Sequence, residues 1–592
     1  MATTTLTDSQ RVPVLSEQKK QTEYMQSMAE SLVKMAKSAW KDNGSLDNYI
    51  VTMLDGTKEK YEAVQRAWLL ANGADTADAA TLTTLLDKWY TITRKPWNGW
   101  VRFYHPDVSS QTTGEKMGDL KDMKCVPSTD TVAGQDDFAG NPLFAITYVN
   151  WTLDTNGLPQ ITAIKGVNAG YEQSNPDKLV GVVQMTGYHW WTTIDESSQY
   201  YYEGYSSTYL TDKTHIEPLP EAVKPDKTVR PWVIHAPYIA GKSSSGKMTC
   251  CSGQIPMGNV SHNNVHDSAR VNGANYSGGC SCDRSFLILM ARLLFGSLTI
   301  DGILNGCYSY WKEYTAKVAE TSTSRIIVAD DAKNIFVVGS NVTIITQKHG
   351  STDEIRQSTQ ADATHRYTIT DVQEVTINGT TYCAIYVNAS TKFDTVSDAD
   401  SSVTATCIFP QPWNSGSTDA VLGNTGALNC TDQKHTVKIQ GIEFANAQWE
   451  ILADSINKLW KDTDGKYYYT CYTVNTASKQ STDITSDYIE GDSFPQPTVA
   501  NTQTYIKYEN YKNGMYYPTV TGGSSATYAA DLIEINGNVD NGRREFMCFG
   551  FLDWGATACG LSCLRLRGGL GNAWWSNAAR LSPNGNRGAW GA

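Results

Sequence analysis

The sequence has little charge for its length and no long apolar run. Charged residues make up 19% of the 592 residues, whereas about 25% is usual in soluble proteins. A membrane-spanning helix needs roughly 18 consecutive apolar residues, and the apolar run from Phe286 to Phe295 is too short. We therefore expect no membrane insertion.

Clusters of basic residues are also missing. The formal net charge is −12, and binding to nucleic acid depends on clustered lysine and arginine that neutralise phosphates. We expect no nucleic-acid partner. The first twenty residues contain no apolar core of a secretion signal, so we expect synthesis in a reducing cytoplasm and release by lysis within a particle.

The cysteines do not form the pattern of a disulfide framework. Their number, thirteen, is odd, and they are spread along the chain, so most are expected to be buried thiols. The alternative is a zinc site, although the spacing lacks paired C-x2-C knuckles. Its candidate ligands are Cys250, Cys251, Cys280, Cys282, His262 and His266. We expect no metal and no other cofactor.

Residues 1–96 are predicted to form a helical module for attachment and oligomerisation. Two helices are expected over Lys58–Leu70 and Thr76–Trp89, the second with Asp78 near its start. Residues 16–41 carry apolar residues at alternating steps of three and four, which is typical of a short coiled coil or of a surface helix. These residues are Met25, Met28, Leu32, Met35 and Ala39.

From about Trp97 the pattern changes to short alternating runs separated by turn residues. Residues 143–153 and 179–194 read as antiparallel strands, and the tract 284–311 reads as a buried helix with a Gly-rich exit. Residues 321–409 are predicted to be an inserted β-module with a hairpin turn at Asn378-Gly379. The predicted fold class is therefore multidomain α+β, in which 97–320 and 410–592 are two parts of one domain.

The last residues differ in composition and residue pattern from the rest of the chain. In LRLRGGLGNAWWSNAARLSPNGNRGAWGA (564–592), alternating Leu and Arg lead to a Gly568-Gly569 turn and then to polar, aromatic and Gly residues. A buried strand is expected to feed an exposed loop surface there.

This ending resembles that of C-type-lectin and formylglycine-generating-enzyme-like domains, as found in variable proteins of diversity-generating retroelements and in the major tropism determinants of phages. The segments GIEFANAQWE (441–450) and SFLILMARLLFGSLTIDGILNGC (285–307) are similar to parts of gut-phage tail-fibre proteins with this fold. The resemblance covers roughly 100–320 and 410–592, and this sequence lacks the final G-F-R of the pattern.

The resemblance implies a receptor-binding surface on this ending. Tryptophan rings stack on sugars or fill apolar pockets, while Asn and Arg side chains supply hydrogen bonds. The predicted binding residues are Asn572, Trp574, Trp575, Asn577, Arg580, Asn584, Asn586, Arg587 and Trp590. At least one Trp is expected to be exposed. No cluster of calcium ligands is found nearby, so we expect calcium-independent binding.

The sequence thus predicts a phage virion adhesin, a homotrimeric fibre on the tail or capsid. Its partners would be a host-surface glycan or protein and, through the N-terminal region, other virion proteins. The alternatives are a structural fibre or decoration protein of the virion without receptor binding and, with less support, a glycan depolymerase. The residues considered for catalysis are Asp195 with Glu196, Glu443 with Glu450, and Cys548, Cys559 and Cys563. None forms a recognisable catalytic motif, and we expect no enzymatic activity.

Overall fold

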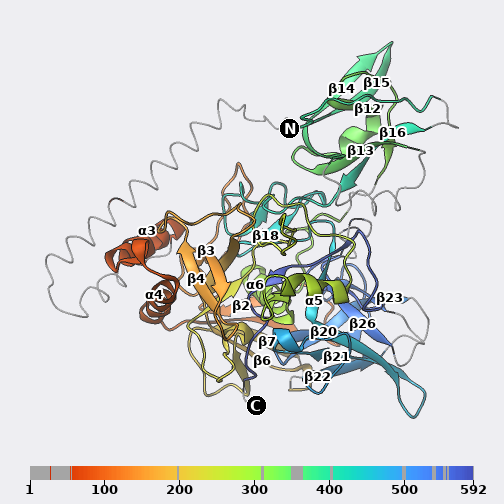
Figure 1. The fold of residues 1–592 in the computed structure, drawn as a ribbon. Coiled ribbons are helices and arrows are strands. Elements are labelled where there is room, and N and C mark those ends of the chain that lie inside the picture. Colours follow the sequence, from red (N-terminus) through yellow and green to blue (C-terminus); the bar gives the residue numbers. More distant parts are fainter. Residues whose placement is uncertain are drawn as a thin grey trace.

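The computed structural model describes residues 57–590, apart from short gaps, together with Ser27 and Leu54. The gaps are 197–198, 309–311, 348–363, 400–403, 496–501, 536–541, 551, 553–554 and 556–558. Within this part of the chain, the protein is mostly β-sheet, with six sheets and four α-helices (Figure 1). It is a multidomain α+β protein. The predicted coiled coil over 16–41 lies outside the described residues, Ser27 excepted.

The two predicted N-terminal helices are confirmed as α3 (Lys58–Ala71) and α4 (Ala79–Ile92). Asp78 caps α4, because its side chain accepts a 2.8 Å hydrogen bond from the backbone N–H of Thr81. The helices pack through aromatic residues, and the indole of Trp89 donates a 2.8 Å hydrogen bond to the hydroxyl of Tyr61. Together they cover the edge of the neighbouring sheet, where α4 contacts β4 (Figure 1).

Two antiparallel sheets follow, and they confirm the predicted strands around 143–153 and 179–194. The five-stranded sheet has the order β2 (Glu115–Gly118), β1 (Asn98–Tyr104), β7 (Tyr200–Ser206), β6 (Tyr188–Trp191) and β8 (His215–Pro218). The four-stranded sheet has the order β4 (Pro159–Ile164), β3 (Ile146–Leu153), β5 (Leu179–Met185) and β9 (Trp232–His235).

The predicted buried helix is confirmed as α6 (Ser281–Phe295). Every residue of this helix from Ser281 to Leu294 is buried. It ends at Gly296, whose φ of 63° lies in the left-handed region that favours glycine. A second helix, α5 (His262–Arg270), precedes it. Figure 1 shows both helices at the centre of the molecule. The short 3-10 helices are η1 (Ala74–Thr76), η2 (Ile194–Glu196), η3 (Pro220–Ala222), η4 (Asp330–Asn334) and η5 (Ala477–Lys479).

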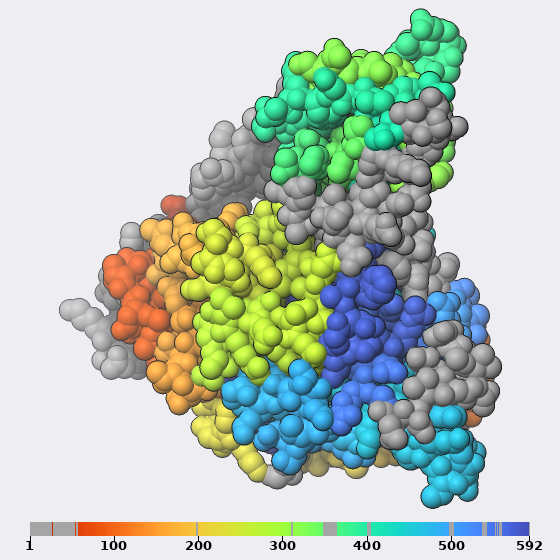
Figure 2. Space-filling view, turned by 45° about the vertical axis from the view of Figure 1, so that its right-hand side comes forward, coloured from red at the N-terminus to blue at the C-terminus, as the bar shows by residue number. Residues whose placement is uncertain are grey.

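One six-stranded sheet forms a separate lobe (Figures 1 and 2). The predicted hairpin joins two of its strands, and Asn378 and Gly379 both have positive φ, at 52° and 80°, as a two-residue hairpin turn requires. The sheet begins before residue 321, because its first strand pairs with its last. Its order is β11 (Tyr314–Thr315), β16 (Ala405–Gln411), β13 (Asn341–Gln347), β14 (Arg366–Ile377), β15 (Thr380–Val387) and β12 (Arg325–Ala329).

The remaining strands belong to three sheets. A small sheet contains β17 (Gly426–Ala427), β18 (Val437–Ile439) and β19 (Ile442–Phe444), and β10 (Ser277–Gly278) pairs with β29 (Leu581–Ser582). The nine-stranded sheet has the order β22 (Ile489–Pro495), β21 (Tyr467–Thr473), β20 (Trp449–Lys461), β26 (Arg543–Cys548), β27 (Leu564–Arg565), β25 (Leu532–Ile535), β23 (Thr502–Lys512) and β24 (Met515–Thr521), with β28 (Asn577–Ala578) beside β20.

Two hydrophobic cores organise these sheets. The larger core contains residues from α3 and α4, from both N-terminal sheets, from α6 and from the nine-stranded sheet. The smaller core fills the six-stranded lobe and also takes in Trp575 from the C-terminal segment. Residues far apart in sequence therefore share one body, whereas the six-stranded lobe has a core mostly of its own.

Candidate functional site

The C-terminal segment 564–590 is held in the body by short strand pairings. β27 pairs with β26 and β25, β28 runs parallel to β20, and β29 pairs with β10 just before α6. In Figure 2 this dark blue segment lies against the yellow-green surface formed by residues that precede α6. Some side chains of the segment therefore face the body, and others face solvent.

Arg580 faces the body, which corrects the prediction that it binds a receptor. Only 3% of the residue is exposed. Its guanidinium lies 2.9 Å and 3.1 Å from the two carboxylate oxygens of Glu450 and donates a 2.7 Å hydrogen bond to the carbonyl of Ala236. This two-point ion pair ties the segment to β20 and to the end of β9.

Arg587 is also buried and also belongs to the scaffold rather than to a binding surface. It is 5% exposed and lies 2.6 Å from a carboxylate oxygen of Asp454. The same carboxylate accepts hydrogen bonds from the backbone and hydroxyl of Ser281 at the start of α6. Asp454 thus joins the positive end of the buried helix to the C-terminal arginine.

The asparagines follow the same pattern, with one exception. Asn577 and Asn584 are buried and donate to the carbonyls of Val260 and Ile234, and half-buried Asn586 donates to the carbonyls of Gly157 and Asn275. Because their amides satisfy backbone groups of other segments, Asn577 and Asn584 are not available to a receptor. Asn572 is exposed.

The tryptophans divide into one buried and two exposed residues. Trp575 is 4% exposed and lies in the smaller core, which corrects its assignment to the binding surface. Trp574 and Trp590 are 47% and 40% exposed, and no other tryptophan in the described part of the chain is exposed to this degree. The expectation of at least one exposed Trp is confirmed.

A buried polar network fixes the segment between these tryptophans. His235 lies 2.9 Å from Asp283 and 3.1 Å from Glu221. Ser582 and Asn584 donate to Asp283. Burial alone would lower the pKa of His235, but both carboxylates raise it to about 9. Burial would raise the pKa of Asp283, but its hydrogen bonds lower it to about 2, so the histidine and the aspartate are both charged at neutral pH.

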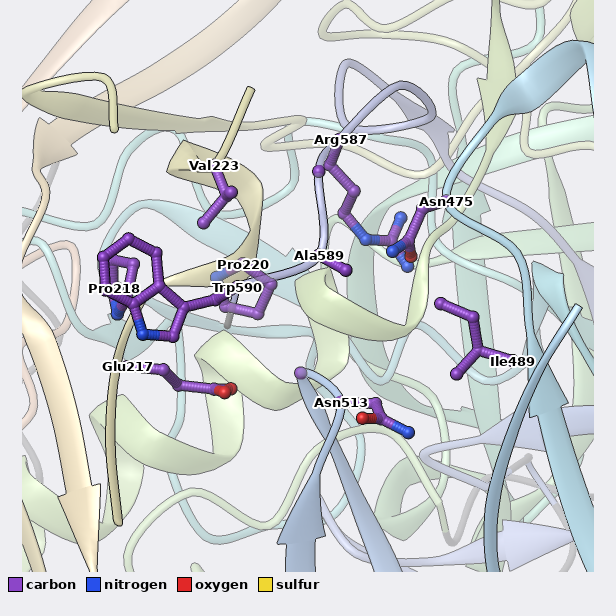
Figure 3. A pocket seen from close by; sticks show the side chains of 12 residues that line it. Glu217, Pro218, Pro220, Val223, Asn475, Ile489, Asn513, Arg587, Ala589 and Trp590 are labelled. Carbon is purple, nitrogen blue, oxygen red and sulfur yellow. The ribbon is translucent and has the colours of Figure 1, made fainter. Parts of the chain in front are cut away.

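A pocket of about 250 Å³ lies where the C-terminal segment meets β8 (Figure 3). Trp590 stands beside Pro218, Pro220 and Val223 on one side, and Asn475, Ile489 and Asn513 come from other segments of the body. The carboxyl of Glu217 also lines the pocket. Burial raises its pKa to about 7, against the effect of hydrogen bonds from Tyr511 and the Gly514 backbone.

The pocket combines one exposed aromatic ring with an acid and two amides. Such a surface suits a ligand with both apolar faces and hydroxyl groups, because the ring provides a flat contact and the polar groups provide orientation. Of the predicted residues, the pocket brings Trp590 and Arg587 together, although the guanidinium of Arg587 is already paired with Asp454. Trp574 does not line this pocket.

Sequence reasoning missed Glu217, Asn475 and Asn513. Each lies in a turn or a short strand far from the C-terminal segment in sequence. The one sequence signal near the pocket is the alternation of aromatic residues around 188–205, which indicates strands with one face toward solvent. This alternation does not indicate which distant loops lie against those strands.

The residues considered for catalysis or zinc binding have structural roles. Glu443 accepts hydrogen bonds from the backbone N–H groups of Gly416 and Thr418, and Glu450 pairs with Arg580. Asp195 and Glu196 form part of η2, where Glu196 pairs with His215. All thirteen cysteines are free thiols and eleven are buried, which confirms the expectation of buried thiols. Burial raises the pKa of the Cys548 and Cys563 thiols, which keeps them unreactive.

The same described residues lack both a cluster of metal ligands and a membrane-spanning helix. They contain no group of three or more His, Cys, Asp or Glu side chains arranged to hold a metal ion. Of the zinc candidates, His262 and His266 lie together with ring centroids 4.4 Å apart, and a ring nitrogen of His266 is hydrogen-bonded to the carbonyl of Ala453. None of the described helices has the length and apolar character needed to cross a membrane.

No protein-family model matches the chain, and no curated protein matches it in sequence.

Proposed function

We propose that this protein is a phage virion adhesin, a fibre on the tail or capsid that binds a glycan or protein on the host surface. Binding would occur through the C-terminal part of a C-type-lectin-like domain. The N-terminal region would attach the fibre to other virion proteins, and a homotrimer would gain affinity from several sites on one particle.

One observation carries the proposal. The exposed tryptophans of the described chain are Trp574 and Trp590, and both lie in the last twenty residues. Tryptophan is mostly buried in folded proteins, and where it is exposed it is a frequent anchor of binding surfaces. The backbone that carries these rings is fixed by buried ion pairs at Arg580 and Arg587. A rigid support lowers the entropic cost of binding.

The alternative is a structural virion protein, in which the same tryptophans would pack on neighbouring subunits. Both functions use exposed aromatic rings, so they must be separated by experiment. No observation favours a catalytic function, because the buried carboxylates Glu443 and Glu450 are fully used by hydrogen bonds and ion pairs.

The test is binding of the purified full chain to a panel of bacterial strains. The variant carries Trp574→Ala and Trp590→Ala, which remove only exposed rings, so its melting temperature should match that of the wild type. The control is Trp460→Ala, because Trp460 is a half-buried tryptophan on β20, stacked on Tyr468 and remote from the C-terminal segment in sequence.

Loss of cell binding in the double variant, with binding retained in the control, supports the adhesin. Equal binding by all three proteins shows that the C-terminal rings are not the receptor contact. Absence of cell binding by the wild type, together with burial of Trp574 and Trp590 in assembled particles, identifies a structural virion protein instead.

A further inference from the structure

The five-stranded sheet has a solvent face built of aromatic residues. Along β1, buried and half-buried residues alternate, so that Val101 and Phe103 face the core while Trp100 and Arg102 face outward. The register places Trp100, Gly204 and Trp190 side by side on the outer face. Tyr202 and Tyr188 lie on the same face, two residues away along their strands.

Glycine at position 204 makes this face possible. A Cβ atom at Gly204 would lie 2.1 Å from the ring of Trp190, so the indole can rest flat on the sheet only where the side chain is absent. The indole nitrogen of Trp190 donates a 3.0 Å hydrogen bond to Asn98, and the ring centroid of Trp100 lies 5.8 Å from that of Trp190. The aromatic surface is therefore rigid.

A cleft of about 340 Å³ opens on this face. Trp100, Trp191 and Tyr202 supply its aromatic walls, and Glu196, Asp212 and Thr192 supply acceptors and a hydroxyl. The cleft is distinct from the C-terminal pocket, and no residue lines both.

The cleft and the C-terminal pocket lie at opposite ends of one short strand. Thr214, just before β8, lines the cleft, and Glu217 and Pro218 at the end of β8 line the pocket. Three residue steps of a strand span about 10 Å. Successive side chains point to opposite faces, so Pro218 shares the outer face with Tyr188 and Trp190, whereas Glu217 points to the other face. Tyr209, which is 49% exposed, has its ring 6.4 Å from Trp590 of the pocket and 5.7 Å from Tyr188, which lies two residues before Trp190 of the cleft on the same strand.

We propose that the cleft, Tyr209 and the C-terminal pocket together bind one neutral oligosaccharide, whose sugar rings extend from Trp590 past Tyr209 to Trp100 and Trp191. The inference rests on the proposed function and names the class of receptor. It adds a binding site on a part of the chain that lies at least 350 residues before the C-terminal segment in sequence.

The chemistry of the two sites selects a sugar over a protein. The cleft places several aromatic rings beside carboxylates and hydroxyls, and the pocket places the ring of Trp590 beside a carboxyl and two amides. Sugar rings present apolar C–H faces and hydroxyl edges that match both arrangements. A stable protein partner would instead cover about 800 Å² on each side and would need a broader apolar centre.

Charge selects a neutral sugar. The cations that line the two sites are already paired with carboxylates, Lys213 with Asp212 and Arg587 with Asp454, so they do not present an unpaired positive charge to an anionic sugar. The net charge of −12 also opposes the approach of a polyanion. An acidic polysaccharide would therefore bind poorly.

The inference is tested by calorimetric titration of the full chain with cellohexaose, maltohexaose, mannohexaose and laminarihexaose, with hexagalacturonic acid as the anionic comparator. The variants are Trp100→Ala, Tyr209→Ala and Trp590→Ala, and the control is Trp460→Ala. Tyr209→Ala guards against misfolding, because Tyr209 is an exposed loop residue whose removal leaves the sheet intact. The same proteins are tested for binding to bacterial cells.

We expect at least one neutral hexasaccharide to bind, and each of the three variants to weaken that binding by about tenfold or more. The corresponding disaccharide should respond to the variants of one site only, since it is too short to reach the other. The hexagalacturonate should bind more weakly than the neutral sugars.

Three results would overturn the inference. If Trp590→Ala weakens cell binding while Trp100→Ala and Tyr209→Ala bind like the wild type, the adhesin function stands and the sheet face is not part of the site. If the wild type binds cells but no neutral hexasaccharide, the receptor is a protein or a charged glycan. If the wild type binds neither cells nor sugars, the proposed function and this inference both fail.

Discussion

The C-terminal stretch 577–587 and the six-stranded lobe at 314–411 are both rich in polar residues, yet they are stabilised in opposite ways. The stretch has almost no strand of its own and is held by buried ion pairs and amide hydrogen bonds to distant segments. The lobe has long paired strands and a core mostly of its own, and its ion pairs, such as Arg325–Glu320, lie near the surface. Polar composition therefore says little about burial, because buried polar groups need partners that come from elsewhere in the chain.

The largest loss of stability should appear when a buried arginine of the C-terminal stretch is removed. Arg580→Ala leaves the buried carboxylate of Glu450 without its partner, and we expect a loss of about 3–5 kcal/mol in the free energy of unfolding. The control Arg543→Ala breaks an exposed pair with Asp483 and should cost less than about 1 kcal/mol. Denaturant unfolding measures both. Equal losses would mean that Arg580 is not energetically part of the core.

The lobe should respond to a change in its own core. Ile385 is fully buried on β15, and Ile385→Ala should cost about 2–5 kcal/mol because it leaves a cavity. We expect calorimetry to show two unfolding transitions, one for the lobe and one for the body. In Ile385→Ala only the lobe transition should shift to a lower temperature. The matched control is Val338→Ala, since Val338 is 53% exposed in the same lobe. A shift of both transitions by Ile385→Ala would show that lobe and body unfold as one unit.

Alkaline pH should weaken the body more than the lobe. The pKa of buried His235 is raised to about 9 by Asp283 and Glu221, whereas about 6.5 is usual in an unfolded chain. A raised pKa stabilises the folded state below about pH 6.5, and this stabilisation is lost as the pH rises through 9, on the order of 3 kcal/mol.

The measurement is the melting temperature of the body transition between pH 6 and pH 9.5. The wild type should lose stability over this range, and His235→Gln should be less stable at pH 6 but nearly flat with pH. A parallel fall in both proteins would assign the pH dependence to other groups.

The smallest effect on stability is expected at the exposed tryptophans. Trp574→Ala and Trp590→Ala remove surface rings, so each should change the free energy of unfolding by less than about 0.5 kcal/mol, in contrast to Trp575→Ala. Trp575 is buried in the smaller core, and its removal should cost about 3–5 kcal/mol. Thermal unfolding separates these cases, and a large loss from Trp574→Ala would place that ring in the fold rather than on a binding surface.

Local patterns in the sequence predicted the elements well. The helical spacing of Tyr61, Val64 and Trp68, the cap at Asp78, the apolar tract of α6 and the turn at Asn378-Gly379 are all properties of a few neighbouring residues. Such signals depend only on residues that are close together in sequence, so they can be recognised without knowledge of the fold.

The candidate site could be predicted only in part. The segment around Trp574 and Trp590 was identified, and both rings are exposed, but Trp575, Asn577, Arg580, Asn584 and Arg587 are buried. Adjacent residues such as Trp574 and Trp575 face opposite ways, and the sequence does not say which of the two faces solvent. The sequence does not predict that the aromatic sheet face lies near the C-terminal pocket, because this proximity depends on how β8 and its loop are placed in the fold.

By itself, the sequence determined that this protein is a β-rich chain with a central buried helix, an internal sheet module and an aromatic, Asn-rich ending. Those properties follow from periodicity and turn chemistry, which are local. The tertiary structure decided which polar residues of the ending are scaffold and which are surface. That division depends on Glu450 and Asp454, more than 125 residues earlier in the chain, because a charge can be buried only where folding brings an opposite charge to it.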